Sequence, residues 1–473
     1  MRPSPSRERS RGDAPNEPDA HRTPDAPPRR VAIVAPCPGC RVTAGALTPA
    51  GLPRAAAARV DGTRFDLART VLPPPLRPGA ELAVLDVTEF YGDTSGGVRT
   101  YLDRKAAYVA ARPALRQTVL VPGERDALDD GDGVRLYQLG GPRVPMRPPY
   151  RFMLALRQPR RVAEHERPDV IEVGSPGLVP WLVRHATRRT GAPLVHFWHS
   201  HYPRQLAGLA RGGVRGAFGA ARGALAWAYA RRLDRAFALT FVASDFAAGE
   251  LRAAGVDRVA RVPLGVDLGH FHPRRRAHAV RTRARAGLPV GAPLAVYVGR
   301  FAAEKRLDVL LRAWPRVRRR TGARLALVGA GPERGRLAGL IDAAGAICVP
   351  FERERGALAD LITAADLYVA PGPIETFGLA VLEALACATP VLAVDAGGAG
   401  ELVARSGGGA RFAPGDPDAL ADAAESLLDL GAHGLHALGH AGRAYAEREH
   451  GWDAVFDRLF GHYRDVAAGR WGR

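Results

Sequence analysis

Short apolar runs alternate with amphipathic stretches along most of the chain. The run ELAVLDV at 81–87 is followed by a glycine-bearing loop and the helical stretch RTYLDRKAAYVAAR at 99–112. Further apolar runs are QTVLVP, VRLYQL, PDVIEVG, APLVHFWHS and AFALTFVAS, with arginine-rich helical stretches between several of them. This alternation predicts an α/β fold, with a parallel sheet covered by helices on both faces.

The pattern breaks at VARVPLGVDLGHFHPRRR, where proline, glycine and a basic run indicate a linker, and a second series then begins with APLAVYVGR and RLDVLLRAWPRVRRR. Two parallel-sheet domains joined by one linker are expected to form a ligand cleft at the carboxyl ends of their strands. The predicted divisions are an N-terminal extension at 1–78, a first domain at 79–270, a linker at 271–288, a second domain at 289–450, and a C-terminal helix at 451–473 that packs back on the first domain.

Composition adds limits to this picture. The 473 residues, 47% hydrophobic, suffice for two well-packed domains. No apolar run is long enough to cross a bilayer, and the N-terminus has no signal-peptide region. Residues 1–30 are rich in proline and charge, which predicts disorder. Cys37 and Cys40 lack the second pair of a zinc site, and four cysteines in this length favour a reducing cytoplasm.

The net charge of +19 comes almost wholly from arginine. Of 67 basic residues, only Lys105 and Lys305 are lysines, which leaves 65 arginines. Coding bias explains most of these positions. A lysine kept against such a bias suggests a place where a compact ammonium is required and a planar guanidinium is a poor substitute.

The stretch PGPIETFGLAVLEALA at 371–386 combines an apolar helix with two carboxylates, Glu375 and Glu383. Proline and glycine predict a helix start near Thr376 or Phe377, with free N–H groups around Gly378. Eight helical residues rise roughly 12 Å. A nucleoside-diphosphate sugar would fit this spacing, with its diphosphate at the helix start and a hydroxyl-rich sugar at each carboxylate. An N-cap glutamate followed by an ordinary surface glutamate remains the alternative at this point.

A pair of cations follows another predicted strand. In YVGRFAAEKRLD, the strand ends at Gly299, Arg300 comes next, and Lys305 lies near a helix start. Both cations are expected at the carboxyl edge of the second sheet, where they would suit a diphosphate leaving group. Solvated surface charges are the alternative, which the rarity of lysine makes less favoured.

The first domain offers two further candidates. Gly96 and Gly97 lie between its first strand and helix, and paired glycines permit a close approach of ligand to backbone. HFWHSHYPR ends a predicted strand with three histidines, of which His199 and His201 are expected to point the same way. No acidic partner at metal spacing accompanies them, so we expect contacts to a sugar or acceptor instead of zinc.

Two other motifs do not indicate a functional site. VGAGPERGRL at 328–337 has Arg334 where a dinucleotide-binding fingerprint needs its third glycine, which argues against a hydride-transfer enzyme. DDGD at 129–132 is interpreted as a solvated loop and not as a metal site.

The motifs SGGVRTYL, VASDFAAGEL, VPLGVD, VGRFAAEKRLDVLLRA, LVGAGPERGRL and ETFGLAVLEALACATPVLA together resemble, in order and spacing, the retaining glycosyltransferases of family 4, which have the GT-B fold. The resemblance runs from about residue 81 to the C-terminus. FWHSHYP is similar to the histidine motif of the mannosyltransferase and sulfoquinovosyltransferase branches. The sequence departs from the family in PGPIETFG, where a serine-rich lead is commoner, and in GGAGE at 397–401, which lacks the usual proline.

By position, the resemblance implies that Glu375 and His199 contact the donor sugar and that Glu383 binds the ribose. Arg300 and Lys305 would neutralise the diphosphate. No metal and no cofactor is implied. The remaining donor-site positions that it implies are Gly96, Gly97, Gly299, Thr376, Phe377, Gly378 and Leu379.

The expected activity is transfer of a hexose to a hydroxyl with retention at the anomeric carbon, with GDP-mannose favoured as donor and a UDP-sugar next. Alternatives are a GT-B sugar-nucleotide epimerase and a non-catalytic basic binding protein on a degenerate GT-B fold. No nucleic-acid partner is expected. The segment 204–235 holds seven arginines among apolar residues, which suggests a cytoplasmic enzyme peripheral to the inner face of the membrane, with a lipid-linked or glycan acceptor. The acceptor or membrane candidates are His201, Arg211, Arg215 and Arg222.

Overall fold

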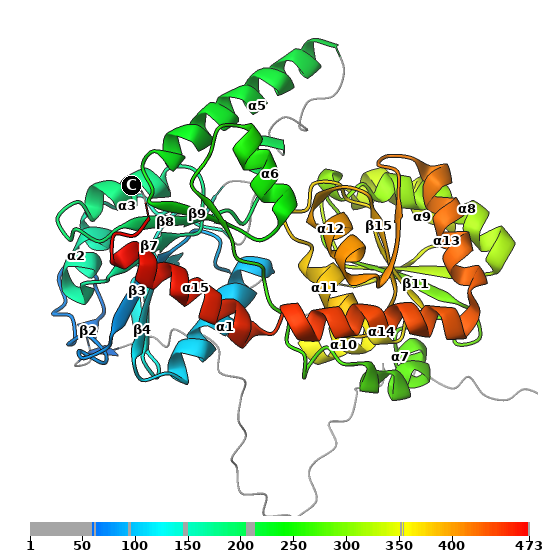
Figure 1. Cartoon of the computed structure of the whole chain (residues 1–473), viewed down its shortest axis with the longest axis horizontal. Coiled ribbons are helices and arrows are strands. Elements are labelled where there is room, and N and C mark those ends of the chain that lie inside the picture. Colours follow the sequence, from blue (N-terminus) through cyan, green and yellow to red (C-terminus); the bar gives the residue numbers. More distant parts are fainter. Residues whose placement is uncertain are drawn as a thin grey trace, which may run out of the picture. The chain divides into compact units, whose positions relative to one another are not determined.

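The computed structural model describes residues 59–60, 63–92, 96–144, 150–204, 213–350, 352 and 354–471. Cys37 and Cys40 lie outside the described residues. Strands β1 (Arg59–Val60) and β2 (Thr63–Arg64) form a short antiparallel pair. The rest of the described chain contains two α/β domains, each built on a sheet of mainly parallel strands (Figure 1), which confirms the predicted fold class.

The first domain has an eight-stranded sheet. All neighbouring strands run parallel except for β5, which pairs antiparallel with β6. Its inner strands are buried along nearly their whole length, which explains why they appear in the sequence as unbroken apolar runs. In order across the sheet, the strands are β10 (Val259–Arg261), β9 (Leu239–Val242), β8 (Leu194–Phe197), β7 (Val170–Val173), β3 (Leu82–Val87), β4 (Leu115–Gly123), β6 (Val134–Gly140) and β5 (Ala127–Asp130).

Helices connect most of these strands. The last helix of the chain, α15, also belongs to this domain, since it contacts α1 and β7 (Figure 1). Residues 65–72, which precede the boundary predicted at residue 79, add Phe65, Leu67 and Leu72 to this domain's core. The helices are α1 (Gly97–Ala110), α2 (Arg157–Glu166), α3 (Val179–Ala186), α5 (Gly213–Asp234), α6 (Asp245–Ala253) and α15 (Trp452–Ala467).

The second domain has a six-stranded sheet in which every neighbouring pair is parallel. The stretch predicted as a linker, 271–288, contains η1 (Pro273–His278) and α7 (Ala279–Arg285), which contact α10. The strands, in order across the sheet, are β13 (Ile347–Val349), β12 (Arg324–Val328), β11 (Leu294–Val298), β14 (Leu367–Ala370), β15 (Val391–Val394) and β16 (Gly409–Phe412). The other helices are η2 (Ala303–Lys305), α8 (Leu307–Thr321), α9 (Arg334–Ala344), α10 (Arg355–Thr363), α11 (Leu379–Ala386), α12 (Gly397–Ser406), α13 (Pro417–Asp429) and α14 (Gly431–Glu449).

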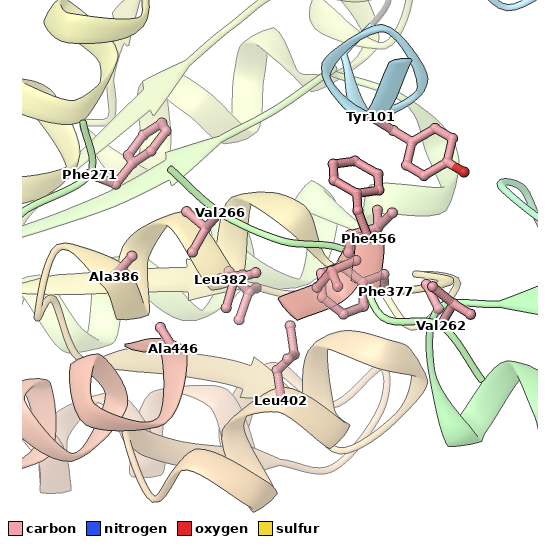
Figure 2. Close-up of a cluster of buried hydrophobic side chains, with 14 of the residues drawn as sticks. Tyr101, Val262, Val266, Phe271, Phe377, Leu382, Ala386, Leu402, Ala446 and Phe456 are labelled. Atoms are coloured by element: carbon pink, nitrogen blue, oxygen red, sulfur yellow. The ribbon is translucent and has the colours of Figure 1, made fainter. Parts of the chain in front are cut away.

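One buried cluster includes side chains from both domains. Figure 2 shows Tyr101 of α1 beside Phe456 of α15, with Phe377 and Leu382 of the α11 region in the same cluster. The rings of Tyr101 and Phe456 have centroids 5.8 Å apart. The C-terminal helix is therefore packed into the first domain although it follows the second domain in sequence. Among the described helices, none combines the length and hydropathy needed to cross a bilayer.

Candidate active site

The start of α11 lies at the carboxyl end of β14. The helix begins at Leu379, so the start predicted near Thr376 or Phe377 is wrong by two or three residues. Gly378 precedes it with φ of 94°, a left-handed conformation that favours glycine, and Phe377 is buried. The helix begins later than predicted because Phe377 and Gly378 form a tight turn before it. The N–H groups of Leu379 and the next two residues have no partner within the helix, so an anion can bind there.

Two acid–base pairs lie beside this turn. Lys305 Nζ donates a hydrogen bond to Glu375 Oε1, and the two side chains are 23% and 27% exposed. Arg300 Nη2 donates to Glu304 Oε1 at 2.7 Å, with the arginine side chain 65% exposed. The structure thus brings Lys305 and Glu375 together from positions 70 residues apart. Each cation is neutralised by a neighbouring carboxylate.

Glu383 lies on α11 and is only 5% exposed, which excludes the alternative of an ordinary surface glutamate. Its Oε1 accepts a hydrogen bond from Arg355 Nη2 at 3.1 Å. Burial raises the pKa of Glu383 to about 7, and the guanidinium of Arg355 opposes that rise. A buried carboxylate with a single arginine partner is well suited to accept hydrogen bonds from hydroxyl groups.

The histidine motif meets the α11 turn through the backbone. Thr376 Oγ1 donates to the carbonyl of His199 at 3.1 Å, and Ser244 Oγ donates to the carbonyl of Thr376 at 2.6 Å. The imidazole of His199 stacks on Phe197, with centroids 4.3 Å apart. Burial lowers the pKa of His199 to about 3, so the ring is neutral near neutral pH. The predicted donor-sugar residues Glu375 and His199 are therefore neighbours through Thr376.

The glycine loop of the first domain reaches the same helix start. Gly96 precedes α1 and Gly97 is its first residue. A Cβ added to Gly97 would lie 4.0 Å from Leu379 Cδ2, while one added to Gly96 would meet open space. Gly299 directly follows β11, next to Arg300. Gly97 of the first domain thus approaches the start of α11.

Comparisons with known proteins agree with this geometry. Residues 96–265 match the glycosyl transferase 4-like domain, and residues 281–444 match the family of glycosyl transferases group 1. A "GDP-mannose-dependent alpha-mannosyltransferase" of Mycobacterium tuberculosis is 32% identical over 365 residues, covering 74% of this chain and 86% of the relative. This chain belongs to the group 1 glycosyltransferases. The resemblance to the family 4 enzymes, and to their mannosyltransferase branch, is confirmed.

Two further similarities extend the comparison. A "GDP-mannose-dependent alpha-(1-6)-phosphatidylinositol dimannoside mannosyltransferase" of Mycobacterium tuberculosis is 32% identical over 351 residues, covering 73% of this glycosyltransferase and 88% of the relative. The solved structure of a sucrose-phosphate synthase from Thermosynechococcus elongatus has a TM-score of 0.67 at 21% identity, covering 82% of this chain and all of that one. The latter supports the GT-B fold of this glycosyltransferase.

His201 differs from its prediction. Strand β8 ends at Phe197, so residues 199 and 201 do not alternate along a strand, and the expectation that both side chains point the same way is wrong. His201 is buried against Trp227, with ring centroids 5.4 Å apart, and its Nε2 lies 3.4 Å from Glu250 Oε2. Its surroundings in this glycosyltransferase are those of a core histidine.

The basic candidates can be placed only in part. Arg211 lies outside the described residues, and Arg215 lies on α5 with a side chain that the structure does not describe. Arg222 is exposed on α5. In the DDGD stretch, Asp130 binds Arg135 and Asp132 binds Arg77, so at least two of these aspartates take part in ion pairs.

The glycine turn of VGAGPERGRL has a packing role in this glycosyltransferase. A Cβ added to Gly331 would lie 2.3 Å from the carbonyl oxygen of Phe301, so only glycine fits there. This supports the structural interpretation of the turn over a dinucleotide fingerprint.

Sequence reasoning missed Arg355. It lies at the start of α10, donates to Glu383, and donates through Nη1 to Thr100 Oγ1 at 3.2 Å. Its guanidinium carbon also lies 5.1 Å from the centroid of the Phe271 ring. One arginine therefore connects α1, α10 and α11. Its place at the start of a predicted helix was the available signal, but nothing marked it among 65 arginines.

Proposed function

We propose that this glycosyltransferase transfers a hexose from a nucleoside-diphosphate sugar to a hydroxyl group, with retention at the anomeric carbon. GDP-mannose is the favoured donor and a UDP-sugar the second choice. The observation that carries the proposal is the set of Lys305, Arg300, Glu375 and Glu383 around the start of α11. The names of the two mycobacterial relatives support GDP-mannose.

The arrangement suits electrostatic catalysis. The diphosphate would take the ammonium of Lys305 from Glu375 and the guanidinium of Arg300 from Glu304, and would accept hydrogen bonds from the first N–H groups of α11. Glu375 would then be free to accept from sugar hydroxyls, and Glu383 from the ribose. Positive charge that stabilises the departing diphosphate lowers the barrier while the acceptor hydroxyl attacks from the same face. Two cations and a helix N-terminus supply this charge without a divalent metal.

The test is direct turnover. Purified chain is incubated with GDP-mannose, UDP-glucose and ADP-glucose, and nucleoside-diphosphate release is followed together with the anomeric configuration of the product by proton NMR. We expect GDP release and an α-anomer as the first product. A β-anomer would contradict retention, and no release from any of the three donors would contradict the activity.

The two alternatives predict other results. An epimerase would convert the donor sugar without releasing nucleoside diphosphate, and a non-catalytic basic protein would leave all donors intact. The paired cations and carboxylates around α11 favour transfer over simple binding, because a basic protein that only binds an anionic partner needs neither Glu375 nor Glu383.

We also propose that the enzyme docks on an anionic membrane surface through α5. The support is an exposed face on which Arg222 lies beside Leu225, whose side chain is 72% exposed, while Ala226, Ala230 and Leu233 pack inward. Each cation near an anionic surface contributes about 1 kcal/mol. A lipid-linked acceptor would be presented at the same surface, and the second mycobacterial relative is named for a phosphatidylinositol substrate.

Vesicle co-sedimentation tests the docking. Binding to phosphatidylglycerol vesicles should be seen at low salt, weaken steeply with added salt, and fall when Arg211, Arg215 and Arg222 are replaced by glutamine. As a matched control, replacing Arg312, Arg318 and Arg319 of α8 by glutamine should leave binding unchanged. Wild-type protein that stays in the supernatant at low salt would favour a soluble acceptor.

A further inference from the structure

A group of buried polar side chains in the first domain has no part in the mechanism above. Its centre is Lys105 on α1, which is fully buried and donates from Nζ to Asp86 Oδ1 and to Tyr463 Oη, each at 2.6 Å. Glu172 Oε1 lies 3.8 Å from the same nitrogen. The hydroxyl groups of Tyr101 and Tyr463 both donate to Glu172. We call these five residues the Lys105 cluster.

The cluster joins four elements of the first domain. Asp86 of β3 and Glu172 of β7 are direct partners across the parallel strand pair, so both carboxylates lie at one level of the sheet. Lys105 comes from α1, and Tyr463 comes from α15, 358 residues further along the chain. The side-chain amide of Gln117 donates to the second oxygen of Asp86 at 2.7 Å. Because the ammonium, both carboxylates and both tyrosine hydroxyl groups have hydrogen-bond partners, these side chains are fixed in place.

Tyr101 connects the cluster to His199. While its hydroxyl group is held by Glu172, its ring packs edge-on against the imidazole, with centroids 5.2 Å apart and planes at 61°. Phe197 stacks on His199, and the ring of Tyr101 contacts both of them, with its centroid 5.0 Å from that of Phe197. Tyr101, Glu172 and His199 also line one small pocket, together with Thr88 and Gly174. Among the residues that the structure describes, none is a hydrogen-bond partner of this imidazole.

We infer that Lys105 is a positioning residue, which through Glu172 and Tyr101 fixes the imidazole of His199 on the donor-sugar side of the proposed site. The inference rests on the proposed function only in giving His199 a ligand. It also assigns α15 a role in the site, because Tyr463 supplies the hydroxyl group between Lys105 and Glu172.

The chemistry of the cluster explains why this position is a lysine. The ammonium lies among the rings of Tyr101, Tyr463 and Phe460, at 5.6, 4.7 and 5.9 Å from their centroids. The ammonium of Lys105 has two hydrogen-bond acceptors, Asp86 and Tyr463. A guanidinium has five donors in a planar arrangement, which is more than these acceptors can satisfy. Arginine at this place would leave buried donors without partners, which is costly.

Charge in the cluster also affects protonation at the site. Burial raises the pKa of Glu172 to about 7, and Lys105 opposes that rise. Burial, His196 and Lys105 together lower the pKa of His199. The titratable groups near the imidazole are therefore His196 on β8, Tyr101 and Lys105 on α1, Asp86 on β3, Glu172 on β7 and Tyr463 on α15. Removing Lys105 should raise the pKa of Glu172 further. His199 should stay neutral, but its ring should move.

The test compares two hydroxyl deletions at the same helix pair. Tyr463→Phe removes the bridging hydroxyl group of the cluster, whereas Tyr108→Phe removes a hydroxyl group that binds Asp457 elsewhere between α1 and α15. With carbon-13-labelled histidine, the His199 resonance, assigned by its loss in His199→Gln, should move in Tyr463→Phe and stay in place in Tyr108→Phe. GDP-mannose turnover should fall about tenfold only in Tyr463→Phe, a barrier change of about 1.4 kcal/mol. GDP affinity should stay within twofold in both.

Lys105→Met and Lys105→Arg extend the comparison. If they fold, both should move the His199 resonance, and arginine should not restore it. An unmoved His199 resonance in Tyr463→Phe would overturn the inference even if every lysine variant failed to fold. If wild-type protein turns over no sugar nucleotide, the proposed function fails, while the NMR comparison still decides whether the cluster positions His199.

Discussion

The only two lysines of the chain occupy opposite environments. Lys105 is fully buried in the first domain and has fixed hydrogen-bond partners from α15 and β3. Lys305 is 23% exposed in the second domain and has one carboxylate partner, Glu375. These two are the only lysines among the 67 basic residues, and the compact ammonium is buried in one place and partly exposed in the other.

The difference separates a permanent interaction from an exchangeable one. A fully buried ammonium with strong acceptors cannot be released without leaving charges in the protein interior. A partly exposed ion pair contributes little to stability, so the lysine can exchange its carboxylate partner for phosphate at small cost. Lys105 should therefore matter most for stability and positioning, and Lys305 for donor chemistry.

The largest effect on stability is expected for Lys105→Met. Removing the cation leaves Asp86 and Glu172 buried without it and should cost about 3–5 kcal/mol of unfolding free energy. The pKa of Glu172 is already raised to about 7 in the folded protein, so protonation relieves the strain and the loss should be smaller at pH 5 than at pH 8. Urea unfolding at both pH values measures it, with Lys305→Met as the matched control that changes stability by less than about 1 kcal/mol.

The largest effect on turnover is expected for Lys305→Ala. Loss of one main electrostatic donor should lower the turnover number by at least about a hundredfold. The fold should stay intact, because this lysine at the domain edge supports no core. Circular dichroism and steady-state kinetics on GDP-mannose check both parts. Turnover within a few-fold of wild type would remove Lys305 from the mechanism.

A smaller effect should follow from Arg355→Met. The ribose should bind the ionised form of Glu383, whose pKa of about 7 means that GDP affinity rises with pH and levels off above neutrality. Without Arg355 that pKa rises further, so the plateau should move to higher pH. Calorimetric titration with GDP from pH 6 to 9 measures the shift. Arg275→Met, a nearby arginine bound to Asp360, serves as the control, and an identical profile in Arg355→Met would contradict the role.

The smallest effect is expected from metal removal. Two cations and the start of α11 already meet the diphosphate, so activity should persist in EDTA. Complete loss of activity in EDTA, restored by magnesium or manganese, would mean that a metal ion neutralises the diphosphate, a role that we assign to Arg300 and Lys305.

The sequence revealed features that are local and missed those that join distant segments. Buried parallel strands appear as apolar runs, so both sheets could be predicted from the pattern. Glu375 and Glu383 lie eight residues apart on one turn and helix, and their placement followed from spacing. The start of α11 was wrong because Gly378 adopts a left-handed conformation. The Lys105 cluster could not be predicted, since its partners come from β3, β7 and α15.

His201 shows another limit of sequence patterns. The prediction assumed that β8 continues past His199, but the strand ends at Phe197, and the next residues turn so that Trp198 and His201 pack together near Trp227. Alternation along a strand predicts a shared face only while the strand lasts.

The most direct test of the donor site is calorimetric titration of GDP into the wild-type chain, Lys305→Ala, Glu383→Gln and Tyr463→Phe. We place the diphosphate at Lys305 and the ribose at Glu383, both apart from the Lys105 cluster. We therefore expect GDP affinities of the wild type and Tyr463→Phe to lie within twofold of each other, and those of the other two variants to be at least about tenfold weaker. Equal affinity in all four proteins would contradict the donor site, and loss of binding in Tyr463→Phe alone would reverse the assignment of the two domains.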